Sequence, residues 1–177
     1  MPNALTFETD RLVLRPPVLD DFDDSLAMWS DPEVTHFISG KPSTREEVWA
    51  RLLRYVGHWT LLGFGFWAVR EKATGRFLGE VGFADFHRDI EPSHDGLPEI
   101  GWAFARHAHG QGFATEAVRG ALRWSDAQWP GRETVCIVAP ENTASLRVAA
   151  KCGFVERVRT SYKTQPTIVL RRNASDA

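Results

Sequence analysis

The sequence lacks the features of a membrane protein, of a disulfide-stabilised secreted domain and of a protein that coats nucleic acid. Its 177 residues include only two cysteines, Cys136 and Cys152, which provide no disulfide framework. No apolar run is long enough to cross a bilayer, and the N-terminus has neither the basic region nor the apolar core of a signal peptide. With 21 basic and 23 acidic residues, the net charge is −2, which argues against a nucleic-acid partner. We expect one cytoplasmic domain spanning residues 1–177, with free thiols and no membrane contact.

Two common phosphate-binding patterns are also missing. A Walker-type loop requires Gly-Lys-Ser/Thr after a four-residue spacer, and no such sequence occurs. A dinucleotide fold requires Gly-x-Gly-x-x-Gly directly after a strand, within repeated βαβ units. Here Thr115 holds the third glycine position of the segment 110–115, and five residues separate Phe104 from Gly110. A dinucleotide-dependent enzyme is therefore a disfavoured hypothesis.

What the chain does contain is a strand, a glycine turn and a helix start in the segment Glu99–Thr115. Bulky and small residues alternate with the two-residue period of a strand, Ile100, Trp102 and Phe104 being bulky and Gly101 and Ala103 small. The glycines that follow let backbone N–H groups approach an anion, and a helix N-terminus adds unpaired donors and positive partial charge. We interpret the segment as the binding site of a phosphate-bearing cofactor, which would lie along the small-residue face of the strand. A plain glycine turn before a core helix is the alternative.

The remaining chain predicts a mixed α and β domain. Alternation and turn residues predict strands at 9–15, 64–70, 76–83, 134–139, 155–161 and 167–171, and apolar spacing predicts helices at 20–30, from 43 or 44, from 114 and from 142. Residues 31–42 and 85–98 are expected to be loops. The early strands are joined by hairpins and should be antiparallel, whereas the strand–helix–strand unit from Glu99 to Ala139 should give a parallel pair.

A second polar helix start, Asn142-Thr-Ala-Ser145 continuing to Cys152-Gly153-Phe154, favours the cofactor interpretation. Together with the loop Gly110-Gln-Gly-Phe-Ala114, it resembles the cofactor motifs of the GNAT superfamily of acetyl-CoA-dependent N-acetyltransferases. The segments Thr9–Arg15 and Asp31–Val34 further resemble the RimJ/RimL-like branch. The resemblance implies an α+β GNAT-like fold. Its twisted, mostly antiparallel mixed sheet would have about six to seven strands, with helices on both faces and a parallel strand pair at the cofactor site.

The resemblance also implies acetyl transfer from acetyl-CoA to a primary amine by direct attack. The amine would be a protein N-terminus or a small molecule. Glu99 is the first candidate for the general base, acting through water, and a structural ion pair is its alternative role. The residues expected to bind the cofactor are Trp102, Ala103, Phe104, Gln111, Gly112, Phe113, Ala114, Thr115, Asn142 and Ser145. Candidate acceptor-binding residues are Trp29, His36 and Phe37.

The sequence departs from the family pattern at two positions. His109 stands where the loop usually opens with Arg or Gln, and Ala149 stands where many members have a Tyr that protonates the departing thiolate. Ser145, Tyr162 or water would have to supply that proton, although Ser145 is equally suited to a helix surface and Asn142 to a helix cap. Because Ala149 lacks this proton donor, a non-catalytic domain that binds CoA or acyl-CoA is the alternative hypothesis. His107 and His109 have too few neighbouring ligands to predict a metal, and a monomer or homodimer is expected.

Overall fold

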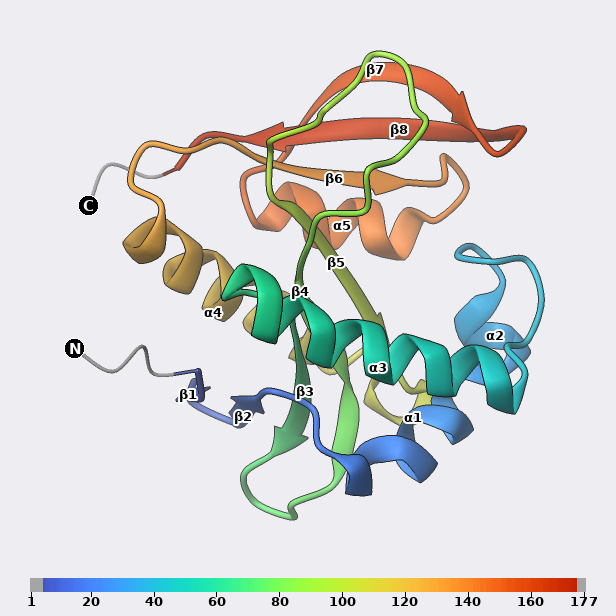
Figure 1. Cartoon of the computed structure of the whole chain (residues 1–177), viewed down its shortest axis with the longest axis vertical. Coiled ribbons are helices and arrows are strands. Elements are labelled where there is room, and N and C mark those ends of the chain that lie inside the picture. The colour runs from blue at the N-terminus through green and yellow to red at the C-terminus, as the bar shows by residue number, and fades with distance from the viewer. Residues whose placement is uncertain (1–4, 175–177) are drawn as a thin grey trace.

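The computed structural model describes residues 5–174 and contains one eight-stranded sheet with helices on both sides (Figure 1). The order of strands across the sheet is β1-β2-β3-β4-β5-β6-β8-β7. The strands are β1 (Phe7–Glu8), β2 (Leu12–Arg15), β3 (Phe66–Glu71), β4 (Phe77–Ala84), β5 (Glu99–Phe104), β6 (Thr134–Val138), β7 (Val155–Tyr162) and β8 (Gln165–Arg172). The helices are α1 (Phe22–Trp29), α2 (Pro32–Thr35), α3 (Arg45–Leu62), α4 (Phe113–Gln128) and α5 (Thr143–Lys151), with short 3-10 turns at Leu19–Asp21 and Arg106–Ala108. The predicted fold class is confirmed, and β1 adds a strand to the predicted number.

The helix ends follow from local chemistry that the sequence displays. Thr44 caps α3 by accepting a hydrogen bond from the Glu47 N–H at 3.2 Å, and the Glu47 carboxylate accepts one from the Thr44 N–H at 2.8 Å. Gly63 ends the same helix in the left-handed conformation, with φ of 74°. The segment 31–42, expected to be a loop, instead begins with the short helix α2, because Asp31 caps it and Pro32 suits its first turn.

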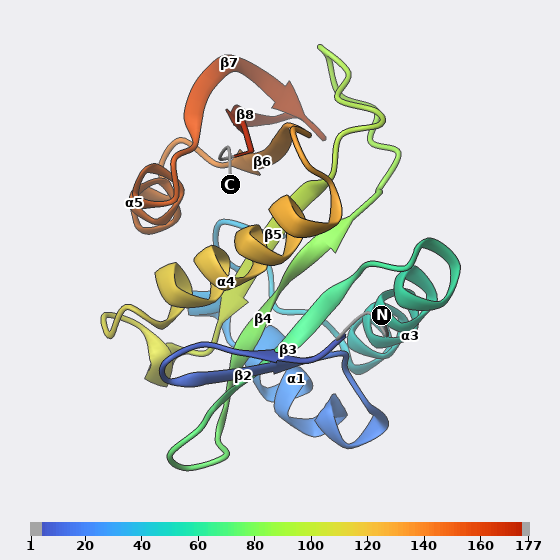
Figure 2. The same cartoon turned by 90° about the vertical axis from the view of Figure 1, so that its left-hand side faces the viewer.

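Two apolar layers cover the two faces of the sheet. The helices α4 and α5 pack against one face and α1 and α3 against the other (Figure 2). On the first face the fully buried Trp67 and Phe83 share a cluster with Val118 and Ala149. On the second face, Trp29 and Leu52 share a cluster with Ala103. Within residues 5–174, no helix is both long enough and apolar enough to cross a membrane.

The sheet changes its pairing at the β5–β6 junction. On one side β5 pairs antiparallel with β4 along its whole length, from Glu99 opposite Ala84 to Phe104 opposite Gly79. On the other side β5 pairs with β6 in parallel, as predicted, but at one position only, Glu99 opposite Val135. The two strands separate beyond that pair (Figure 2). Among the described residues 5–174, the edge of β5 that faces β6 therefore has no strand partner over most of its length.

Candidate active site

The backbone edge of β5 offers hydrogen-bonding groups toward β6. The Ala105 N–H donates to the Leu78 carbonyl of β4 at 2.9 Å, and hydrogen bonding alternates along an antiparallel pair. The N–H groups of Trp102 and Phe104 therefore point away from β4, toward the side on which β6 has separated. An extended chain could pair with this edge as an added strand does.

The small-residue face of β5, by contrast, is not open to a cofactor. Residues on that face of the strand pack against the α1 and α3 layer, where Ala103 is only 6% exposed. A methyl group at Gly101 would lie 3.1 Å from the Phe66 ring. The sequence-based expectation of a bare face is therefore wrong, because α1 and α3 cover it, and the accessible part of β5 is its backbone edge.

The glycine turn after β5 presents backbone donors at the start of α4. Gly110 and Gly112 both have left-handed φ values, 74° and 80°, so side chains larger than glycine would be strained there. The first intrahelical bond of α4 runs from the Glu116 N–H to the Gly112 carbonyl at 3.1 Å. The N–H groups of the preceding first turn, residues 113–115, have no intrahelical acceptor. The turn thus has the geometry of an anion-binding site.

Arg11, which lies between β1 and β2, holds this turn from outside. Its guanidinium donates to the Glu116 carboxylate at 2.7 Å and to the Gln111 carbonyl at 3.0 Å, and lies over the Phe113 ring at 4.4 Å. Its backbone N–H donates to the other oxygen of the same carboxylate at 2.8 Å, and Thr9 donates to that oxygen at 2.6 Å. The shape of the turn therefore depends on residues about a hundred positions earlier in the chain.

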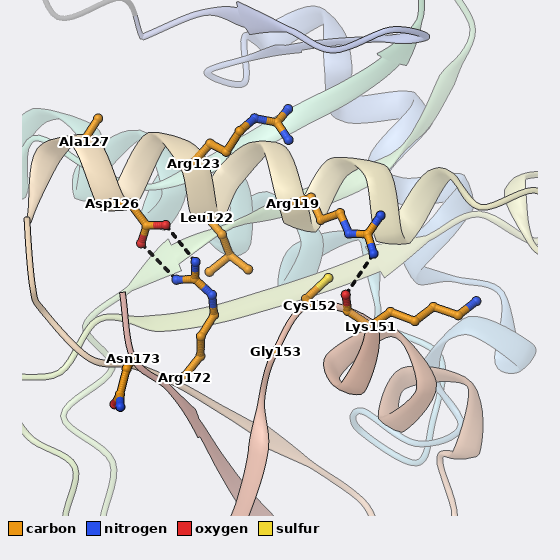
Figure 3. Close-up of a pocket in the computed structure, with 10 residues that line it drawn as sticks. All are labelled: Arg119, Leu122, Arg123, Asp126, Ala127, Lys151, Cys152, Gly153, Arg172 and Asn173. Carbon is orange, nitrogen blue, oxygen red and sulfur yellow. Dashed lines mark hydrogen bonds and ion pairs between the residues drawn. The ribbon is translucent and has the colours of Figure 1, made fainter. Parts of the chain in front are cut away.

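A cation-lined pocket of about 640 Å³ lies along α4, between that helix, the end of α5 and β8 (Figure 3). Arg119 donates to the Lys151 carbonyl at 3.0 Å, and Arg172 forms a two-pronged ion pair with Asp126. Cys152, beside Lys151, lies 3.9 Å from the Thr115 carbonyl in the first turn of α4. This contact places the Arg119–Lys151 end of the pocket close to the glycine turn.

Asn142 and Ser145 are joined by the cap of α5. The Ser145 N–H donates to the Asn142 side-chain oxygen at 3.1 Å, which is the structural role that the sequence offered as an alternative. Both residues are half-buried, and within residues 5–174 the Ser145 hydroxyl has no hydrogen-bond partner. Ala149, one turn further along α5, is completely buried.

Glu99 is a buried carboxylate with both oxygens engaged. Arg88 donates to the two oxygens at 2.7 Å each, and the His94 Nε2 donates to one of them at 3.1 Å. Burial alone would raise the pKa of Glu99, but hydrogen bonds from His94 and Arg88 outweigh it, so the pKa is lowered. The ion pair that the sequence suggested as an alternative role is therefore present, although Arg88 and His94 carried no motif that would have identified them.

A second buried carboxylate, Glu80 of β4, was missed by sequence reasoning. It is 6% exposed and accepts hydrogen bonds from the Ser25 hydroxyl, at 2.5 Å, and from the Trp29 indole N–H, at 3.0 Å. Burial raises the pKa of Glu80. Trp29 is itself only 3% exposed, with the Arg51 guanidinium 3.7 Å from its ring centroid. An acidic residue within an alternating strand is no signal of burial, so only the structure identifies this cluster.

The other candidates lie further apart. His36 and Phe37 follow α2, are exposed, and contact each other with ring centroids 4.5 Å apart. His107 donates to the Phe77 carbonyl at 2.9 Å and His109 to the Phe104 carbonyl at 2.8 Å, so both support the turn after β5. Within residues 5–174, no three His, Cys, Asp or Glu side chains are grouped as metal ligands.

Comparison with known proteins identifies this arrangement. Residues 11–155 match the family described as acetyltransferase (GNAT) domain. The chain is 34% identical over 152 residues to the uncharacterized protein YkkB of Bacillus subtilis, covering 82% of this chain and 83% of that protein.

Two solved structures extend the comparison. A putative GNAT-family acetyltransferase from Bordetella pertussis superimposes with a TM-score of 0.83 at 30% identity, covering 94% of this chain and 98% of that one. Spermidine N-acetyltransferase from Vibrio cholerae, solved with CoA and spermine, shares the fold with a TM-score of 0.74 at 19% identity, covering 94% and 98%. The chain therefore belongs to the GNAT acetyltransferase family.

Proposed function

We propose that the protein transfers the acetyl group of acetyl-CoA to a primary amine, and that the open edge of β5 holds the coenzyme. The observation that carries this proposal is that backbone donors are available at two places, along that edge and at the start of α4 beyond the glycine turn. The Trp102 and Phe104 N–H groups face the side left by β6, and the first-turn N–H groups of α4 follow after the turn. A coenzyme with an amide-containing arm and a pyrophosphate needs both kinds of donor.

The residues present fit this coenzyme. The segment Gln111–Thr115 would bind the pyrophosphate through its main-chain N–H groups, since Gly110 and Gly112 keep side chains out of the turn. Arg119 and Lys151 would meet the remaining phosphate, because their end of the pocket adjoins the turn. Because the Asn142 side-chain oxygen caps α5, its amide NH₂ group would hydrogen-bond to the amide-containing arm of the coenzyme. The coenzyme supplies the activated acetyl group as a thioester.

The chain's own groups would support the transfer of protons and charge. The Trp102 to Phe104 backbone would polarise the acetyl carbonyl through its N–H groups. Glu99, whose pKa is lowered, remains ionised at neutral pH and would accept the amine proton through water. A base this weak suits an amine of pKa about 8, such as a protein N-terminus, better than lysine at about 10.4. We accordingly propose the RimJ/RimL-like branch, in keeping with the segment Thr9–Arg15.

The proton for the departing thiolate could come from Ser145, from Tyr162 or from water. Ser145 presents a half-buried hydroxyl at the start of α5. Tyr162 instead lies beside Arg88, with its ring centroid 5.0 Å from the guanidinium carbon. Because Ala149 is buried and has no acidic proton, it cannot contribute. We favour Ser145, directly or through water, since it shares the helix start with Asn142.

The Ala149 position also favours a second candidate function, a domain that binds CoA or acyl-CoA without turnover. A thiol-release assay with a panel of amines, combined with calorimetric titration of acetyl-CoA, separates the two. Amine-dependent thiol release supports the transferase. Tight binding of acetyl-CoA without transfer to any amine supports the binding module, and the absence of binding contradicts both. The variant Ser145→Ala should lower the maximal rate while leaving acetyl-CoA affinity unchanged.

A further inference from the structure

Three arginines gather on the side of the sheet covered by α3, and one of them, Arg88, is bound to Glu99. Arg51 and Arg54 come from α3, and Arg88 comes from the loop between β4 and β5. Arg54 and Arg88 both lie over the ring of Phe86, 5.4 and 4.4 Å from its centroid. Like charges brought together in this way repel one another unless anions compensate them.

The two buried carboxylates, Glu99 and Glu80, compensate only part of this charge. Arg88 is paired with Glu99, whose two oxygens together accept three hydrogen bonds from Arg88 and His94. Arg51 faces the buried Glu80, yet its Nε is buried without a hydrogen-bond partner in the part of the chain that the structure describes. Within residues 5–174, Arg54 forms no ion pair with a carboxylate. Its pKa is lowered, mainly by partial burial, with Tyr55 opposing the shift and the neighbouring Arg51 and Arg88 adding to it.

The position of this cluster relates it to the reaction. In the proposed site, the glycine turn and α4 would hold the coenzyme's phosphates on the α4 side of the sheet, which leaves the α3 side for the approach of the amine. Glu99 shares the face of Ala103 and is bound by Arg88 on that side. An acceptor that reaches the start of β5 therefore passes the Arg54–Phe86–Arg88 surface.

We propose that the acceptor is an amine that also carries an oxyanion, such as a carboxylate, and that Arg54 and Arg88 bind this group beside Phe86. The inference rests on the proposed acetyltransferase function. Guanidinium groups match carboxylates in geometry, and the Phe86 ring orients both of them before any ligand arrives. The surface disfavours polyamines, because a second ammonium group would face Arg54.

The test compares acceptors that differ only in the group remote from the amine: γ-aminobutyrate, its amide and putrescine. Acetyl transfer is followed by thiol release, and kcat/KM for each acceptor is divided by the value for the amide within each variant. We expect the acid to exceed the amide by about tenfold or more, the effect of a hydrogen bond to a charged group. Arg54→Gln should abolish this preference, whereas Arg54→Lys should retain part of it. Arg45→Gln, the same charge change elsewhere on α3, should leave it intact.

The outcomes separate this inference from the function on which it rests. Equal or faster turnover of the amide or putrescine overturns the inference while the acetyltransferase stands. An acid preference that persists in Arg54→Gln also overturns it, because the preference would then arise elsewhere. Thiol release with none of these acceptors and with no member of the amine panel described above contradicts the proposed function, and the inference falls with it.

Discussion

The Glu99–Arg88 ion pair allows the candidate base to be tested for stability and catalysis separately. The Arg88 and Glu99 side chains are 18% and 6% exposed, so the variant Glu99→Gln leaves a largely buried guanidinium without its counter-ion. Breaking a buried pair by removing one partner costs about 3–5 kcal/mol. We expect about 3 kcal/mol, because the glutamine still accepts one hydrogen bond. For a domain of this size, the melting temperature should fall by about 6–12 °C.

The pH dependence of this loss follows from the lowered pKa of Glu99. A carboxyl group with a lower pKa in the folded state stabilises the fold above its unfolded pKa, about 4.3, and this contribution is lost as the pH falls through the folded value. Urea unfolding should therefore show a constant difference between wild type and Glu99→Gln from pH 6 to 7, roughly, and a smaller one below about pH 4. A loss under about 1 kcal/mol at neutral pH would refute the reasoning.

The matched variant Arg88→Gln removes the same ion pair but keeps the carboxylate. If Glu99 accepts the amine proton, Arg88→Gln should retain turnover and move the acidic limb of the rate profile to higher pH, since the freed carboxylate is more basic. Glu99→Gln should lose turnover across the profile. The acceptor should be an amine without an acid group, so that Arg88 is not also needed for binding. Equal losses in both variants would show that Glu99 acts only through structure.

Three further predictions concern the coenzyme side of the site. Arg11→Met should raise the KM for acetyl-CoA about five- to thirtyfold with little change in kcat, because the half-exposed ion pair with Glu116 and the hydrogen bond to the Gln111 carbonyl together contribute about 1–2 kcal/mol. Steady-state kinetics measure this change. An unchanged KM contradicts the proposed role of Arg11 in holding the glycine turn. Gly112→Ala should lower the free energy of unfolding by about 1–2 kcal/mol because its φ is 80°, and it should weaken the acetyl-CoA affinity measured by calorimetry. The control Gly40→Ala, with φ of 72° and open space around it, should lower the stability alone. Asn142→Ala should cost about 1 kcal/mol through the lost cap, and Asn142→Ser should restore stability; if it also restores acetyl-CoA affinity, the amide does not contact the coenzyme.

The sequence by itself determined the elements whose cause is local. The alternation from Ile100 to Phe104 predicted β5, and Asn142 predicted the start of α5, because periodicity and capping depend on residues a few positions apart. The glycine turn was recognisable for the same reason, since left-handed conformations at Gly110 and Gly112 need no distant partner. Together with the family resemblance, these signals were sufficient for the fold class, and they made the glycine turn the candidate coenzyme loop.

Only the tertiary structure decided what surrounds those elements. Arg11 meets the loop because β2 lies beside β3 in the sheet and so brings a residue about a hundred positions away against α4. Glu99 acquires Arg88 and His94 because a loop folds back over the start of β5. Partners of this kind follow no period in the sequence, and whether a carboxylate is solvated or buried in an ion pair is set by which chain segments the fold places against it.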